Sequence, residues 1–296
     1  MRWPPYEHIF FDCDSTLTAV EGIDILAEMA GKKWRVAVLT NAAMDGKLDL
    51  AEVYAKRLQA IKPTQEQIQE IRRIYKRHIV ADAREVIAAL QALGHQVYII
   101  SGGLAEPVAE FGVHLGVPRS HIRAVHVDYN RLAGRWWEAP PPDADAPPPG
   151  HYLDYEEGAL TISDGKAQIV RELLVEQHGE PDAVSGRSLL IGDGSSDLLA
   201  GKGVDLFVGY GGVVERPRVL ADAPVFLHSP SLAPLLLLAA GPAIGRRLQG
   251  TPHYAIFEKG LQLIQTGALS FNHAKLESKF FQAIHATYQT VYPGTN

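Results

Sequence analysis

Short apolar runs, each ending in a polar turn, recur along the chain. They are rich in β-branched, aliphatic and aromatic residues and are bounded by glycine, serine and aspartate, a pattern typical of buried β-strands. The runs are residues 9–11, 97–100 and 188–191, followed in turn by Asp12, by Ser101-Gly102-Gly103 and by Gly192-Asp193-Gly194. The pattern predicts three buried strands with polar residues at their carboxyl ends.

Helical periodicity fills the segments between these runs. It predicts one helix over Asp82–Leu93, ending at Gly94, and another over Lys166–Gln177, ending before Gly179. Strands that alternate with helices indicate an α/β fold, with a parallel sheet covered on both faces. In such sheets ligands bind beyond the carboxyl ends of the strands. We therefore expect the three polar turns to converge on one site.

Residues 19–79 break this alternation and show helical patterns only, over 21–30, near 45–57 and over 64–75. We predict a helical cap at 19–79 above a core of residues 1–18 and 80–228. Residues 229–296 are predicted to form a helical extension packed on the core. Its last helix has apolar residues at helical spacing, namely Leu276, Phe280, Phe281, Ile284, Tyr288 and Val291. The Pro-rich stretch 139–150 is predicted to be a surface loop.

The composition narrows the class of protein. The chain has 296 residues, a formal net charge of -6 and no block of basic residues, which argues against nucleic-acid binding. Its single cysteine, Cys13, excludes an internal disulfide, and the N-terminus lacks the apolar segment of a secretory signal. The most apolar stretch, Leu232–Gly241, is about half the ~20 residues that a membrane-spanning helix needs. We expect a cytoplasmic enzyme without membrane contact, in which this stretch is a packed helix.

Two carboxylates, Asp12 and Asp14, leave the end of the first predicted strand two residues apart, so they can point the same way. Asp12 can attack a phosphoryl group to form an acyl phosphate, which water hydrolyses in a second step. Asp14 can protonate the leaving alkoxide and then deprotonate that water. Taken alone, the Asp-Cys-Asp-Ser-Thr string could equally be a turn that caps a helix. Cys13, between the aspartates, is expected to point away from them into the core.

The ordered set FFDCDSTL, IISGG, a lysine and IGDGSSD resembles the motif set of the haloacid-dehalogenase superfamily, over residues 7–228. The resemblance implies a Rossmann-like core with a helical cap inserted after the first strand. It also implies a Mg²⁺ cofactor and phosphomonoester hydrolysis. Within the superfamily, the motifs are most similar to those of the phosphoserine phosphatases, which implies a role in serine biosynthesis.

The remaining motifs have physical reasons to accompany the aspartates. Ser101 offers a hydroxyl, and Gly102 and Gly103 leave backbone N–H groups open to a phosphate. Lys166 can place a positive charge beside the transferring phosphoryl group. A bare Ser-Gly-Gly turn or a lone lysine would mean little, because most lysines are solvated surface residues.

A metal site is expected at the same edge of the sheet. Asp193 can complete an octahedral oxygen site with Asp12 and the main-chain carbonyl of Asp14. Asp197 is expected to support this site by hydrogen bonding or by pairing with Lys166, although an ordinary acidic residue at a helix N-terminus is the alternative.

The resemblance also suggests substrate contacts in the cap. Glu21 matches a glutamate that meets the substrate amino group, Arg57 an arginine that holds its carboxylate, and Met44 an apolar residue of the pocket. A carboxylate and a guanidinium together suit a zwitterionic amino acid, so we expect phosphoserine. Taken singly, these residues could be helix-surface charges or a core methionine.

The sequence departs from the family at two positions expected near the substrate. Leu50 replaces a common phenylalanine, and Ser196, a further expected substrate contact, replaces an asparagine or threonine. Gly211, Gly212 and Arg216 belong to a loop that is expected to border the site.

Three other functions are compatible with parts of this pattern. The enzyme could act on another small phosphorylated metabolite, such as an amino alcohol or a sugar, or transfer the phosphoryl group to an alcohol. A catalytically silent binding protein is a third alternative, against which the complete motif set argues. A monomer or a homodimer is expected.

Overall fold

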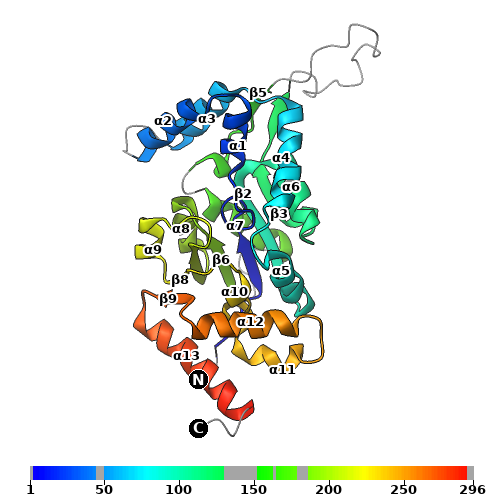
Figure 1. The fold of residues 1–296 in the computed structure, drawn as a ribbon, viewed down its shortest axis with the longest axis vertical. Coiled ribbons are helices and arrows are strands. Elements are labelled where there is room, and N and C mark those ends of the chain that lie inside the picture. The colour runs from blue at the N-terminus through cyan, green and yellow to red at the C-terminus, as the bar shows by residue number, and fades with distance from the viewer. Residues whose placement is uncertain (1–2, 45–49, 130–151, 163–164, 179–185, 292–296) are drawn as a thin grey trace.

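The computed structural model describes residues 3–44, 50–129, 152–162, 165–178 and 186–291. A central sheet carries helices on both sides, with a group of helices above its upper end and another group below (Figure 1). The Pro-rich stretch 139–150 lies outside the described residues.

Seven strands form the sheet in the order β3-β2-β1-β6-β7-β8-β9. All neighbouring pairs are parallel except β8 and β9. A separate antiparallel pair, β4 with β5, precedes α7 in the chain. The strands are β1 (His8–Phe11), β2 (Gln96–Leu104), β3 (Ile122–Val125), β4 (Val127–Tyr129), β5 (Tyr152–Tyr155), β6 (Ser188–Gly192), β7 (Leu206–Tyr210), β8 (Val225–Leu227) and β9 (Leu269–Phe271).

Alternation along the strands divides the core between the two faces of the sheet. In β1, Ile9 and Phe11 belong to one buried cluster, which includes residues of α5 (Ala83–Ala92), α6 (Ala105–His114) and α10 (Ala233–Ala240). Phe10 points the other way, into a cluster with α7 (Lys166–His178), α8 (Ser195–Ala200) and α9 (Pro217–Asp222). Side chains alternate between the two faces of a strand. Every β1 residue is buried because helices cover both faces of the sheet. The predicted three-layer α/β fold is confirmed.

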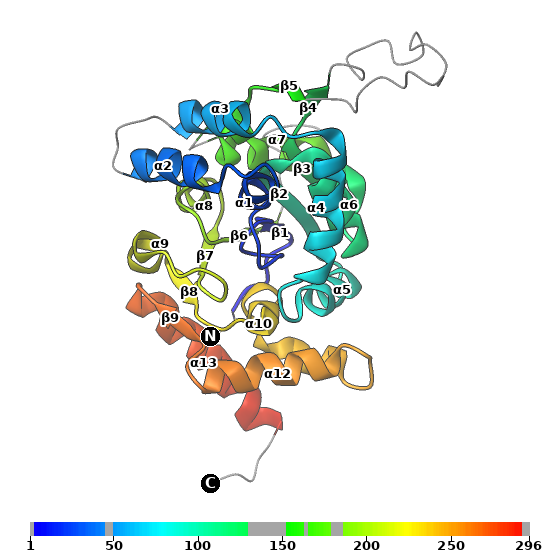
Figure 2. The same cartoon turned by 45° about the horizontal axis from the view of Figure 1, so that its top comes forward.

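Four helices make up the region between β1 and α5: α1 (Gly22–Met29), α2 (Lys33–Met44), α3 (Leu50–Ile61) and α4 (Gln65–Arg77). They lie at the upper end of the sheet in both views (Figures 1 and 2). Thr64 caps α4 reciprocally with Gln67, since each side chain bonds the other residue's backbone N–H. Helix α2 was not predicted from the sequence, and α3 lies a few residues later than the helix predicted near 45–57.

The C-terminal part contains α10, α11 (Gly245–Leu248), α12 (Tyr254–Gln265) and α13 (Ala274–Val291). Helix α10 is buried throughout, as the sequence predicts. The prediction of helices alone was incomplete, because β9 pairs with β8 at the sheet edge. On α13, Phe280 is buried whereas the neighbouring Phe281 is exposed, so the predicted apolar set is only partly core. Among the described residues, none of the helices is long and apolar enough to cross a membrane.

Candidate active site

The three polar turns converge because their strands are neighbours. β1 lies between β2 and β6, with Phe11 in register with Ile99 and Ile191. The carboxyl ends of these strands open into a cavity of about 220 Å³ beneath the helices between β1 and α5. Its lining includes most of the predicted site residues, namely Asp12, Asp14, Glu21, Arg57, Ser101, Gly102, Gly103, Lys166, Asp193, Ser196, Asp197 and Arg216.

Asp12 and Asp14 leave β1 through a tight turn. The backbone N–H of Asp12 still bonds to Ile191 O on the neighbouring strand. Ser15 then adopts a left-handed conformation with φ 57°, and the N–H of Leu17 returns to Cys13 O. Both carboxylates thus reach the cavity, while Cys13 is fully buried in the apolar core, as predicted. Burial raises the pKa of the Cys13 thiol well above its ordinary value, so the thiol stays protonated.

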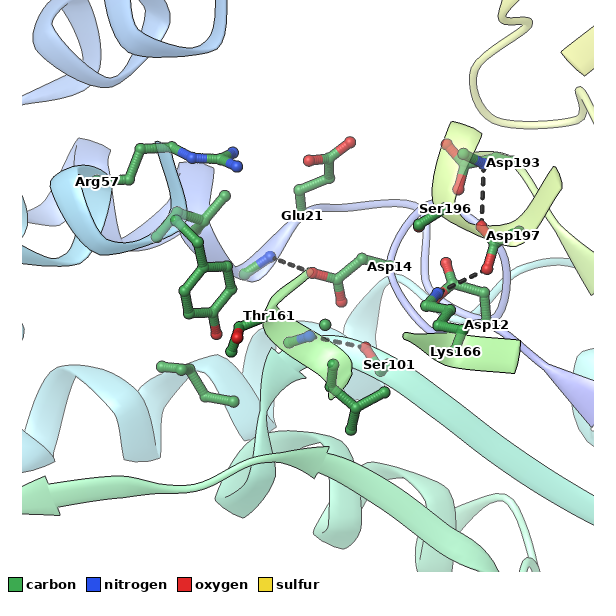
Figure 3. A pocket seen from close by; sticks show the side chains of 18 of the residues that line it. Asp12, Asp14, Glu21, Arg57, Ser101, Thr161, Lys166, Asp193, Ser196 and Asp197 are labelled. Atoms are coloured by element: carbon green, nitrogen blue, oxygen red, sulfur yellow. Dashed lines mark hydrogen bonds and ion pairs between the residues drawn. The ribbon is translucent and has the colours of Figure 1, made fainter. Parts of the chain in front are cut away.

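Lys166, the first residue of α7, joins two aspartates. Its Nζ donates to Asp12 Oδ1 and to Asp197 Oδ1, each at 2.6 Å, and all three side chains are buried (Figure 3). Burial alone would lower the pKa of Lys166, but the two carboxylates outweigh it and raise that pKa, so the lysine stays charged. Burial, and next the charge of Asp197, raises the pKa of Asp12 well above its ordinary value despite Lys166. The lysine therefore offsets part of the effect that burial and Asp197 have on the pKa of Asp12.

Arg216 connects the core to the cap side of the cavity. Its Nε donates to Asp193 Oδ2 at 2.8 Å and its Nη2 donates to Glu21 Oε1 at 2.9 Å. Burial, and next the charge of Asp197, raises the pKa of Asp193 to about 6, against the opposing effect of Arg216. Of the loop expected to border the site, Arg216 lines the cavity. Gly211 and Gly212 do not appear among its described lining residues.

Three buried aspartates form a cluster that fits a divalent cation. Asp12, Asp193 and Asp197 each place a carboxylate oxygen within 4.8 Å of the others. Hard cations favour such oxygen donors. Burial, and next the charge of Asp197, raises the pKa of both Asp12 and Asp193, and a bound cation would offset both effects. The cluster contains Asp12 and Asp193 of the predicted metal ligands, together with Asp197, which was expected to support the site.

The side chain of Asp14 is held by the helices above it. Its Oδ2 accepts a hydrogen bond from Gly22 N at 2.9 Å and its Oδ1 accepts one from Tyr75 Oη at 2.5 Å. Burial raises the pKa of Asp14 to about 6, although both hydrogen bonds act in the opposite direction. A carboxyl group with such a pKa exchanges protons readily near neutrality, as a general acid and base requires.

The turn after β2 presents polar backbone groups to the same space. Ser101 Oγ accepts a hydrogen bond from Gly103 N at 2.9 Å, which orients this hydroxyl beside Asp14 (Figure 3). A Cβ atom on Gly103 would lie 3.1 Å from both Ser101 Oγ and Val108 Cγ2. A larger residue at position 103 would therefore crowd the Ser101 hydroxyl.

The cap side of the cavity carries the predicted charged pair. Arg57 on α3 extends into the pocket toward Glu21 (Figure 3). Its Nε is buried and has no hydrogen-bond partner in the described part of the chain. Burial lowers the pKa of Arg57, with Glu21 and Asp24 opposing. Ser196 lines the opposite wall. The side chains of Met44 and Leu50 lie outside the described residues.

Some lining residues were not anticipated from the sequence. Tyr75, Gly22 and Tyr54 come from the cap helices, and Leu160 and Thr161 come from the turn before α7. Gly22 directly follows Glu21 in the sequence, and the other four belong to no motif. The one sequence feature that points to Tyr75 is its place on the apolar face of α4, with Ile68 and Ile71.

The chain is similar to known proteins over most of its length. Residues 9–202 match the model of the haloacid dehalogenase-like hydrolase family. Phosphoserine phosphatase from Mus musculus is 30% identical over 220 residues, which is 74% of this chain and 88% of that protein. The chloroplastic phosphoserine phosphatase of Arabidopsis thaliana is 33% identical over 224 residues, 75% of this chain and 68% of that protein.

Solved structures show the same fold. A phospho-aspartyl intermediate analogue of phosphoserine phosphatase superposes with a TM-score of 0.59 and 24% identity, covering 79% of this chain and 98% of that one. A substrate-bound phosphoserine phosphatase complex gives a TM-score of 0.60 at the same identity and coverage. The chain belongs to the haloacid dehalogenase-like hydrolase family.

Proposed function

We propose that the protein hydrolyses O-phospho-L-serine to L-serine and phosphate through an aspartyl-phosphate on Asp12. The observation that carries the proposal is the two-ended cavity. Asp12, Lys166 and the Ser101 turn lie at the sheet end, and Arg57 faces Glu21 at the cap end. The buried Arg57 Nε has no hydrogen-bond partner among the described residues, which is costly unless a ligand satisfies it. A substrate carboxylate would do so, because it matches the planar fork of arginine.

The names of the relatives and of the solved complexes agree with this substrate. In the proposed complex, Glu21 meets the ammonium group. Its Oε1 is fixed by Arg216 and by Ser15 Oγ, at 2.9 and 3.3 Å, so the carboxylate needs little reorganisation on binding. A phosphoryl group with an amino-acid leaving group would then span the cavity from Asp12 to Arg57.

The reaction divides into two balanced steps. A carboxylate oxygen of Asp12 attacks phosphorus, the bond between phosphorus and the serine oxygen breaks, and that oxygen takes a proton from Asp14. Water then attacks the acyl phosphate and gives a proton back to Asp14, and the bond between phosphorus and Asp12 breaks to release phosphate. Lys166 and the backbone N–H groups near Ser101 stabilise the charge of the transferring group.

Magnesium is the cation that we propose for the aspartate cluster. Asp12, Asp193 and the main-chain carbonyl of Asp14 would hold it, with Asp197 in support. When bound, Mg²⁺ neutralises the charge that develops on the phosphoryl oxygens. A cytoplasmic location and a monomeric or homodimeric state remain predictions from the sequence.

A substrate panel tests the assignment. Phosphoethanolamine lacks the carboxylate of phosphoserine, and phosphoglycerate lacks its ammonium group. Arg57→Leu is expected to lower kcat/KM for phosphoserine by roughly 100-fold, the size of a lost charge-assisted pair, and to leave phosphoethanolamine little changed. Glu21→Gln is expected to lower kcat/KM for phosphoserine and to leave kcat/KM for phosphoglycerate little changed. Arg218→Leu removes an arginine that is 64% exposed on α9 and serves as the control.

Two results would redirect the proposal. Better turnover of a sugar or amino-alcohol phosphate than of phosphoserine would keep the phosphatase chemistry but refute the substrate. Transfer of phosphate to an added alcohol in preference to water would indicate a phosphotransferase.

A further inference from the structure

The carboxyl group of Asp14 is oriented by two groups from the helical segment above the sheet. Gly22 N, at the start of α1, donates to Oδ2, and Tyr75 Oη, near the end of α4, donates to Oδ1. The terminal torsion of an aspartate side chain is broad, so two donors on different oxygens restrict an otherwise loose group. Asp14 belongs to the core chain, yet these donors come from the insertion.

Tyr75 is fixed firmly enough to act as such an anchor. Its side chain is fully buried, on the same face of α4 as Ile68 and Ile71. Its ring packs edge-on against Phe111 of α6, with centroids 5.4 Å apart and planes at 69°.

Gly22 makes room for this hydroxyl. A Cβ atom at position 22 would lie 2.5 Å from Tyr75 Oη and 3.6 Å from Asp14 Oδ2. Contacts below about 3 Å force a neighbour to move, and the Tyr75 ring is fully buried against Phe111. Gly22 and Tyr75 are therefore a matched pair, since a side chain at position 22 would displace the hydroxyl from Asp14.

The oxygen that Tyr75 contacts is the one that faces the phosphate end of the cavity. A Cβ atom on Gly103 would lie 3.7 Å from Asp14 Oδ1 and 3.1 Å from Ser101 Oγ. Oδ1 thus lies between the Tyr75 hydroxyl and the Ser101 turn. An atom leaving phosphorus at this turn would be within reach of that oxygen.

We propose that Tyr75 is a positioning residue that holds Asp14 Oδ1 toward the leaving oxygen of the substrate, and that Gly22 is required to admit its hydroxyl. This inference rests on the proposed two-step phosphatase reaction and adds to it a group that no motif contains. It predicts an effect confined to the step in which Asp14 delivers a proton to the leaving group.

Leaving-group dependence separates this role from a structural one. An alkoxide needs protonation as it leaves, whereas nitrophenolate does not, and kcat/KM reports the reaction only through transfer to Asp12 when that step is irreversible. Tyr75→Phe is expected to lower kcat/KM for phosphoserine by roughly 10- to 100-fold and to change that for p-nitrophenyl phosphate by less than about twofold. Tyr98→Phe is the control, because Tyr98 is equally buried and its hydroxyl contacts His8 Nδ1, on the amino-terminal side of β1.

A second variant tests the role of the Tyr75 hydroxyl without removing it. Gly22→Ala should produce the same selective loss by displacing the hydroxyl. In the Tyr75→Phe background, where the clashing oxygen is gone, Gly22→Ala should cost little more. Thermal melting of each variant shows whether it is folded.

Equal losses on both esters, or losses that multiply in the double variant, would overturn the proposal. Failure of the proposed substrate has a different result. Wild-type protein would then hydrolyse other alkyl phosphates in an Asp12-dependent way and not phosphoserine. The effect of Tyr75→Phe on kcat/KM would then be compared between the best of those esters and p-nitrophenyl phosphate.

Discussion

Replacing Lys166 by methionine tests whether this lysine compensates the buried charges of Asp12 and Asp197. Lys166, Asp12 and Asp197 have side-chain exposures of 6%, 8% and 2%, and both ion pairs measure 2.6 Å. Removing one partner of a buried pair leaves an uncompensated charge, which costs about 3–5 kcal/mol. For a domain of this size that loss corresponds to a melting temperature lower by roughly 6–20 °C.

The loss should depend on pH in a defined direction. Without the lysine, the pKa of Asp12 in the folded state rises above its already raised position. A carboxyl group with a raised folded pKa contributes stability below its unfolded pKa and loses that contribution as pH rises through the folded pKa. The deficit of Lys166→Met relative to wild type should therefore be larger at about pH 8 than at about pH 5, where the freed carboxylates take up protons.

Lys259 provides a control, because it lies at the same distance from one carboxylate in a more exposed environment. Its Nζ lies 2.6 Å from Asp82 Oδ2, but its side chain is 48% exposed. Lys259→Met should cost no more than about 1 kcal/mol, because solvent screens exposed pairs. Urea unfolding curves at several pH values give both numbers. Equal losses for the two lysines, or a Lys166→Met deficit that does not change with pH, would show that Lys166 does not compensate the buried carboxylates.

Three further predictions concern the metal site and the C-terminal extension. Arg216→Gln should tighten Mg²⁺ binding about fivefold in titration calorimetry, because it removes a cation that competes for Asp193 and is worth roughly 1 kcal/mol at this exposure; unchanged or weaker binding would contradict this. The pKa of Asp193 is about 6 in the folded protein and 3.8 in the unfolded chain. Asp193 therefore stabilises the metal-free protein at low pH and loses this contribution as pH rises through about 6. Added Mg²⁺ should therefore raise the melting temperature more at about pH 8 than at about pH 5, and a uniform rise would count against the cluster. Phe280→Ala should lower the free energy of unfolding by about 3–5 kcal/mol, since Phe280 is fully buried with its ring 4.9 Å from that of Trp3; a loss below about 1 kcal/mol would show that α13 does not stabilise the core.

Much of the core could be predicted from the sequence because local residue patterns determine its helices and strands. The apolar runs before Asp12, Ser101 and Asp193 are short and rich in aliphatic and aromatic residues, and turn residues close each of them, as is typical of strands. Their adjacency in a parallel sheet then follows from the alternation with helices. The convergence of the site residues was predictable for the same reason.

Elements that depend on distant partners were harder to predict. β9 has three residues and is a strand only because β8 offers an open edge. Helix α2 was missed because its sequence, KWRVAVLTNAAM, has no apolar face, as the exposed Trp34 and Val38 show. Tyr75 could be predicted as buried but not as a partner of Asp14, because the contact joins residues 61 positions apart.

If Asp12 carries the phosphoryl group, the acyl-phosphate intermediate can be trapped on this residue. Purified protein with Mg²⁺ is mixed with phosphoserine labelled in its phosphate, quenched with acid within the first turnover, digested and analysed by mass spectrometry. We expect label on the peptide that contains Asp12, sensitive to hydroxylamine as acyl phosphates are, and none in Asp12→Asn. Rapid phosphate release without a labelled peptide, or release that persists in Asp12→Asn, would contradict the account.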